Sequence, residues 1–139
     1  METKWLSSLP SAGDKLLTDE PLSIQEAVRC VESRKYGAIV TFSGCVRDEE
    51  ENAPISAITY EVYAPMAMAE LKKIVEEAES KWKVKAFVRH RVGRVPVGEA
   101  SVVIACAGAH RSEAFQASQF IIEQLKKRVP IWKVHYEKE

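Results

Sequence analysis

A nearly continuous apolar run, Ser101 to Ala107, limits the folds open to this chain more than any other feature of its sequence. A run of this length that is followed by glycine is typical of a strand buried in a sheet. Residues 84–92 precede it and alternate between apolar and polar side chains, and Pro96 to Glu99 has the composition of a turn. The sequence therefore predicts two central strands.

Three other segments have the spacing of apolar residues that helices show. The first opens with the capping-box sequence Ser23-Ile-Gln-Glu26, and its helix is expected to end at Gly37. The second is predicted over Pro65 to Lys83, since proline suits the first turn of a helix. The third follows Gly108 and must end before Pro130, because proline disfavours helical geometry at the preceding residue.

Further strands complete the order of elements. Residues 38–46 are apolar and β-rich, residues 47–54 have the composition of a polar loop, and residues 58–62 alternate between apolar and polar side chains. A last strand is predicted over residues 131–136. Residues 1–21 are expected to form an extended lead-in or an edge strand.

The order of elements indicates the fold class. It reads helix, two strands, helix, two strands, helix and strand, without repeats or a long linker, which favours one α+β domain over residues 1–139. Twenty Lys and Arg balance twenty Asp and Glu, so the chain as a whole offers no basic field for nucleic acid or membranes. Any anion site must therefore be a local cluster.

The cysteines and the N-terminus bear on the compartment. The three cysteines have no metal-ligand spacing, and no apolar run approaches transmembrane length. No secretory leader is recognisable at the N-terminus, so we expect a reducing cytoplasm.

Two lysines near the C-terminus are the leading candidates for chemistry. Lys126 closes the third helix and Lys133 follows Pro130, so the two lysines can converge across the proline bend. A lysine crowded by other cations can act as a nucleophile or proton carrier. The spacing also fits lysines that only interact with the helix dipole and stay solvated. Trp132, beside Lys133, is expected to pack in the core.

Other cations are candidates for binding an anion. His110 and Arg111 stand at the start of the third helix, where free N–H groups favour phosphate. Arg47 closes a strand, where functional groups often lie. Because His90 and Arg91 are adjacent in a strand, they must face opposite ways. His90 shares its phase with apolar neighbours and is expected to be buried, so Arg91 is the better site candidate.

The end of the strand at residues 38–46 holds two further possible site residues, Cys45 and Val46. Cys45 lies two residues before Arg47, which could favour a thiolate, but alternation makes a small buried strand residue the expected state. The acidic residues 48–51 are expected to face solvent and to hold no metal.

Five motifs in order resemble those of one family, the large catalytic subunit of molybdopterin synthase, also called the MoaE family. The similarity runs from about Leu22 to Lys133. The motifs are Gly37-Ala-Ile-Val-Thr-Phe-Ser-Gly-Cys-Val-Arg-Asp48, Tyr60-Glu-Val-Tyr63, His90-Arg-Val-Gly93, His110-Arg-Ser-Glu-Ala-Phe115 and Pro130-Ile-Trp-Lys133. The resemblance implies an α/β-hammerhead fold with a mostly antiparallel sheet and about three helices.

The resemblance also implies an activity and partners. Members of the family form a homodimer within a heterotetramer, together with a small ubiquitin-like sulfur carrier that ends in a thiocarboxylate. They convert cyclic pyranopterin monophosphate, called precursor Z, into the dithiolene molybdopterin. No resident metal or cofactor is implied, since molybdenum is added later on other proteins. Lys126 and Lys133 match the catalytic positions, and Arg47, His110 and Arg111 match the substrate-binding positions.

Two alternatives remain open from the sequence. The chain could be a docking subunit that binds the carrier without catalysis, because fold does not guarantee activity. It could also carry an acyl group or a persulfide on Cys45.

Overall fold

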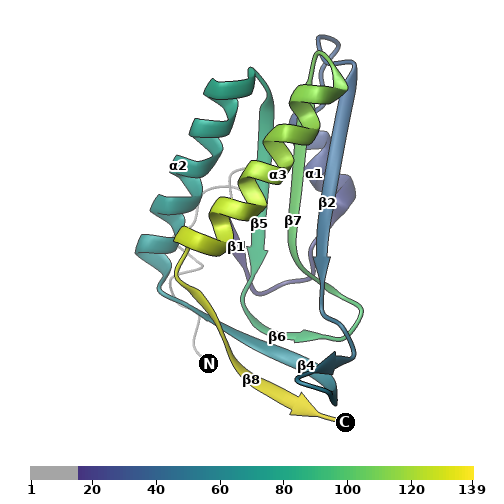
Figure 1. Cartoon of the computed structure of the whole chain (residues 1–139), viewed down its shortest axis with the longest axis vertical. Helices are drawn as coiled ribbons and strands as arrows, with labels where there is room; N and C mark the ends of the chain where they lie inside the picture. The colour runs from purple at the N-terminus through teal and green to yellow at the C-terminus, as the bar shows by residue number, and fades with distance from the viewer. Residues whose placement is uncertain (1–15) are drawn as a thin grey trace.

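The computed structural model describes residues 16–139, which form three helices and two sheets (Figure 1). The first sheet has the strand order β1-β5-β7-β2. These strands span Leu17–Thr18, Lys85–Arg91, Ala100–Gly108 and Ala38–Cys45, respectively. β1 runs parallel to β5, and the other neighbours are antiparallel. The predicted α+β class, with three helices and mostly antiparallel strands, is confirmed.

β7 is a central strand, since it lies between β5 and β2, and both of its faces are covered. Helices α2 (Ala64–Trp82) and α3 (Arg111–Arg128) lie side by side on one face of the sheet, and α1 (Ile24–Val31) lies on the other (Figure 1). Ile104 packs into the core beneath α2 and α3, whereas Val103 packs beneath α1. Alternate residues of the one apolar run therefore fill two separate cores, as its composition predicts.

The second sheet is built on β4 (Ala53–Val62), which pairs with β3 (Glu49–Glu50), β6 (Gly93–Pro96) and β8 (Ile131–Lys138). In Figure 1 it lies across the lower ends of β5, β7 and β2. Its own core consists of Val46, Ile55, Ile58, Tyr60 and Val95. The predicted final strand is confirmed, but the prediction that Trp132 packs in the core is wrong. Trp132 is 53% exposed, because strand alternation turns it away from the face on which its neighbours Ile131 and Lys133 line a pocket.

The segment predicted to be a loop, residues 47–54, contains a short hairpin. Glu49–Glu50 pairs with the start of β4, and the turn residues Glu51 and Asn52 have positive φ angles of 52° and 64°. Two successive positive φ angles are the pattern of a type I′ turn, which suits a tight hairpin. The hairpin was not predicted, because tight turns of this type usually contain glycine and this one has Glu51 and Asn52.

Helix α1 begins where predicted and ends early. The hydroxyl of Ser23 accepts a hydrogen bond from the N–H of Glu26 at 3.1 Å. The helix stops at Val31 rather than Gly37, because Ser33 accepts hydrogen bonds from backbone N–H groups that follow it and closes a local turn.

The N-terminal lead-in is partly described. β1 lies at the edge of the first sheet, as an edge-strand reading of this region predicts, and residues 1–15 lie outside the described residues. Within residues 16–139, no helix is long and apolar enough to cross a membrane. A single domain over the whole chain stays a prediction.

Candidate active site

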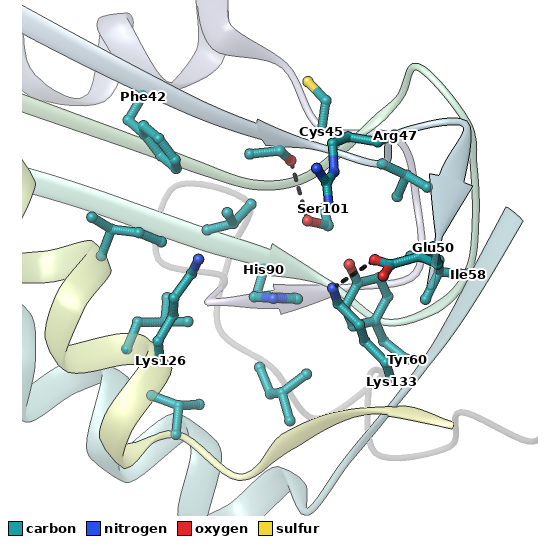
Figure 2. Close-up of a pocket in the computed structure, with 17 residues that line it drawn as sticks. Phe42, Cys45, Arg47, Glu50, Ile58, Tyr60, His90, Ser101, Lys126 and Lys133 are labelled. Atoms are coloured by element: carbon teal, nitrogen blue, oxygen red, sulfur yellow. Dashed lines mark hydrogen bonds and ion pairs between the residues drawn. The ribbon is translucent and has the colours of Figure 1, made fainter. Parts of the chain in front are cut away.

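A pocket of about 530 Å³ lies where the second sheet meets the last turns of α3 (Figure 2). Its walls come from the ends of β2, β5 and β7, from β4 and β8, and from α3. This volume is within the range of pockets that hold small organic ligands. The lining includes Arg47, Glu50, Tyr60, His90, Lys126 and Lys133.

Pro130 allows Lys126 and Lys133 to reach the same pocket. Lys126 lies in the last turn of α3, and the chain beyond the proline extends as β8, in which Lys133 lies opposite Tyr60 of β4. Both lysines line the pocket, and Figure 2 shows them on either side of His90. The convergence that the sequence left open is present.

Lys133 is held by an acidic residue of β3. Its Nζ lies 3.3 Å from Oε1 of Glu50, whose side chain is 17% exposed. The tight hairpin turns Glu50 toward the pocket, so one residue of the acidic run is part of the site, contrary to the expectation that the run faces solvent. Among residues 16–139, no group of three or more His, Cys, Asp or Glu could hold a metal ion.

The end of β2 supplies Arg47, Val46 and Cys45. A register shift between Gly44 and Cys45 interrupts the pairing with β7, and Val46 then donates its N–H to the carbonyl oxygen of Glu99 at 3.0 Å. All three residues line the pocket. Cys45 is exposed rather than buried as expected, because the bulge lies at the end of an edge strand. Its sulfur points away from the pocket (Figure 2).

His90 and Arg91 are adjacent on β5 but have different surroundings. His90 lines the pocket, whereas Arg91 is absent from the lining and pairs through Nη1 with Oε1 of Glu99 at 2.6 Å. The predicted burial of His90 is confirmed, and its ring packs edge-on against Tyr60 with the centroids 5.4 Å apart. Burial lowers the pKa of His90 to about 4, against the opposing effect of a hydrogen bond to the Arg91 backbone. The sequence signalled the burial of His90 but not the pocket beside it, so it favoured Arg91 as the site candidate, whereas His90 is the member of the pair that lines the pocket.

His110 and Arg111 do not reach this pocket. They lie at the N-terminal end of α3, where they were predicted, and Lys126 lies at the C-terminal end. The rise along the helix from Arg111 to Lys126 is roughly 22 Å. Nδ1 of His110 lies 3.7 Å from Oε1 of Glu113 on the same exposed helix end. The predicted site residues of one chain therefore lie in two groups. Lys126 lines the pocket, whereas His110 and Arg111 lie at the other end of α3.

The pocket is more positive than the chain as a whole. Three cations (Arg47, Lys126 and Lys133) and one carboxylate (Glu50) leave a local charge of 3 − 1 = +2, whereas the net charge of the chain is zero. Such a pocket favours small anionic ligands, and an amine within it can act as a nucleophile or donate a proton.

The sequence pattern of the MoaE protein family matches residues 17–128, which is most of the chain. The chain belongs to the MoaE family. Among its relatives, molybdopterin synthase catalytic subunit 1 of Mycobacterium tuberculosis is 41% identical over 121 residues, which cover 86% of this chain and 82% of the relative.

Solved structures agree with membership of the MoaE family. The crystal structure of molybdopterin synthase from Staphylococcus aureus matches with a TM-score of 0.85 and 31% identity, over 91% of this chain and 92% of that one. A complex of subunits 1 and 2 of molybdopterin-converting factor from Helicobacter pylori matches with a TM-score of 0.73. It covers 90% of this chain and 89% of that one at 23% identity, so this second likeness concerns the fold alone.

Proposed function

We propose that this chain is the catalytic subunit of a molybdopterin synthase, a sulfurtransferase of molybdenum cofactor biosynthesis. It transfers sulfur from the thiocarboxylated C-terminus of a small ubiquitin-like subunit to precursor Z, which becomes the molybdopterin dithiolene. The observation that carries the proposal is the convergence of Lys126, Lys133 and Arg47 on one pocket of a MoaE-family fold. We assign the reaction to the cytoplasm, where thiols such as the free cysteines of this chain stay reduced.

The charge of the pocket supports this choice of substrates. Precursor Z carries a phosphate, and the carrier ends in a thiocarboxylate, so both reactants are anions. Arg47 can bind a phosphate through two parallel N–H donors, and the two lysines supply point charges. A locally positive pocket concentrates both anions at one place on a chain without net charge.

The two amines have distinct proposed roles. After the carrier's sulfur has bonded to a substrate carbon, the bond between that sulfur and the carrier's acyl carbon must break. The acyl group passes to water that Lys126 activates, or transiently to the amine of Lys126 and then to water, so that the carrier leaves as a carboxylate and the amine is regenerated. Lys133 orients the substrate and assists proton transfer. The different surroundings of the amines, one at a helix end and one paired with Glu50, support a division of labour.

β8 supplies features that suit an incoming carrier tail. Among the described residues β8 pairs only with β4, so its outer edge can pair with an extended peptide. Trp132 and Val134 flank Lys133 on this strand and are 53% and 50% exposed. Neither residue lines the pocket, so their exposed apolar surface suits contact with the body of the carrier rather than with the acidic C-terminus that enters the pocket.

His110 and Arg111 lead us to propose that the enzyme is a homodimer within a heterotetramer. The two residues match substrate-binding positions of the family, yet a helix length separates them from Lys126 of the same chain. They can bind the same substrate only if a second copy brings its α3 N-terminus to this pocket. The isologous contact of a two-fold dimer would do so twice.

Reconstitution tests the proposed function. The purified chain is mixed with thiocarboxylated small subunit and precursor Z, and dithiolene formation is followed. Product formation that requires all three components is the expected result. Carrier binding without product would indicate a docking subunit instead. Product formed equally well by Cys45→Ala would exclude a mechanism in which Cys45 carries the sulfur or the acyl group.

A further inference from the structure

His90 is a buried ionisable residue that lines the pocket, and its ring lies between the two lysines (Figure 2). It is 6% exposed and lies on β5, a central strand of the first sheet. Its backbone N–H donates to the carbonyl oxygen of Leu16 at 2.9 Å, and its ring packs edge-on against Tyr60. The imidazole is therefore fixed in position by the sheet and by an aromatic neighbour.

One hydrogen bond determines which ring nitrogen carries the proton. Nδ1 of His90 lies 2.7 Å from the backbone carbonyl oxygen of Arg91. Because a carbonyl oxygen can only accept, Nδ1 must be the protonated nitrogen and the donor. In the neutral ring, Nε2 then carries a lone pair and is a hydrogen-bond acceptor. Within residues 16–139, no protein group hydrogen-bonds to Nε2.

The other polar side chains of the pocket are mostly donors or already paired. Arg47, Lys126 and Lys133 can only donate. The carboxylate of Glu50 is paired with Lys133, and the hydroxyl of Ser101 donates to the carbonyl oxygen of Gly44 at 3.1 Å. The hydroxyl of Tyr60, which also lines the pocket, can donate or accept. The cations suit the anionic part of a ligand, whereas an N–H or O–H group of that ligand needs an acceptor such as Nε2 of His90.

We propose that His90 contacts the substrate directly and that its Nε2 accepts a hydrogen bond from an N–H or O–H group of a heterocyclic, anionic ligand. The inference deepens the proposed function and rests on it: the phosphate of precursor Z binds the cations, and a donor on its ring system binds His90. A protonated His90 would add a fourth cation and lose its acceptor. Burial keeps the ring neutral, because it lowers the pKa of His90 to about 4.

Two substitutions separate the two ring nitrogens. In His90→Asn, the side-chain amide nitrogen replaces Nδ1 and can still donate to the Arg91 carbonyl, but nothing replaces Nε2. In His90→Gln, the longer side chain brings an amide oxygen near the position of Nε2 and loses the donor at Nδ1. If His90 has only a structural role, His90→Asn should lose less stability and less activity than His90→Gln. If His90 binds the substrate as proposed, His90→Asn should lose less stability but more activity than His90→Gln.

The experiment measures KM for precursor Z, kcat and the thermal midpoint of both variants in the reconstituted reaction. We expect His90→Asn to raise KM about tenfold with a smaller change in kcat, and His90→Gln to recover part of that loss. If the wild-type protein forms no product, the proposed function fails and this inference fails with it. If the wild type is active and His90→Asn has an unchanged KM, the His90 inference alone is overturned.

A measurement on the unaltered protein covers the case in which the variants do not fold. ¹⁵N NMR of the His90 ring reports the state of each nitrogen while precursor Z is added. We expect a protonated Nδ1 in the free protein, and an unprotonated Nε2 whose resonance moves toward the hydrogen-bonded range as the ligand binds. An Nε2 resonance that does not change at saturation, in a sample whose other pocket resonances do, overturns the proposal.

Discussion

Lys133 and Glu50 form an ion pair inside the pocket, with Nζ of the lysine 3.3 Å from Oε1 of the glutamate. The pair joins β8 to the hairpin of β3, two segments far apart in the sequence. Lys133 is 44% exposed, so the pair is accessible to a ligand that approaches from solvent. An anionic substrate must compete with Glu50 for this lysine.

Replacement of Glu50 by glutamine is therefore expected to tighten substrate binding. The change removes a negative charge from an anion site and frees Lys133, and a partly exposed charge interaction of this kind is worth about threefold in KM for precursor Z. Steady-state kinetics at two salt concentrations would measure it. Glu51→Gln is the matched control, because Glu51 is exposed in the turn of the same hairpin and does not line the pocket. A KM that stays the same or rises in Glu50→Gln would contradict the competition.

Replacement of Lys126 by alanine is expected to lower kcat by about 100-fold or more, because the amine is the proposed acceptor of the carrier's acyl group. Lys126 is exposed on the last turn of α3, so the thermal midpoint of the Lys126→Ala variant should stay within about 2 °C of the wild-type value. Lys127→Ala tests the specificity of the effect, since Lys127 is also exposed and lies outside the pocket lining. Equal losses in the two variants would indicate a general electrostatic effect.

Local patterns predicted the elements that tertiary contacts reinforce. The apolar run at Ser101 became β7, and Pro130 ended α3 within two residues. The hairpin at Glu51 and Asn52 was missed, because its turn has no glycine and its stability depends on pairing with β4. The same turn places Glu50 in the pocket. Missing the turn therefore also led to the wrong prediction that Glu50 faces solvent.

The candidate site shows a similar limit. Alternation correctly separated His90 from Arg91, but it could not say which face of β5 borders a pocket, since the second sheet and α3 close that space from distant parts of the sequence. The family resemblance named Lys126 and His110 together. Only the length of α3 shows that one chain holds them apart.

Gly44→Ala is expected to destabilise the wall of the pocket. A Cβ at this position would lie 2.8 Å from Cγ1 of Val102, which is 5% exposed and held within β7. The end of β2 must shift, at a cost of about 1–3 kcal/mol in the free energy of unfolding. Urea unfolding would measure that loss, and a raised KM would report the displacement of Arg47. Ser43→Ala is the neighbouring control, because the buried hydroxyl of Ser43 has no hydrogen-bond partner within residues 16–139 and its removal should cost little.

The burial of His90 predicts a pH dependence of stability with a defined sign. The pKa of His90 is lowered from 6.5 to about 4 in the folded protein, so between these values the unfolded chain binds a proton that the folded chain does not. Stability is therefore complete above pH 6.5 and falls as the pH drops toward 4, by on the order of 3 kcal/mol in total. The carboxyls of Glu77 and Glu137, whose pKa values are lowered by hydrogen bonds from Arg128 and Arg94, weaken the fold only below their ordinary value of 4.5. Urea unfolding of the wild type and of His90→Asn from pH 7.5 to 4.5 separates the effects, because every other titrating group is common to both proteins. The difference between the two free energies of unfolding should change steadily below pH 6.5, and a constant difference would show that His90 remains protonatable in the folded state.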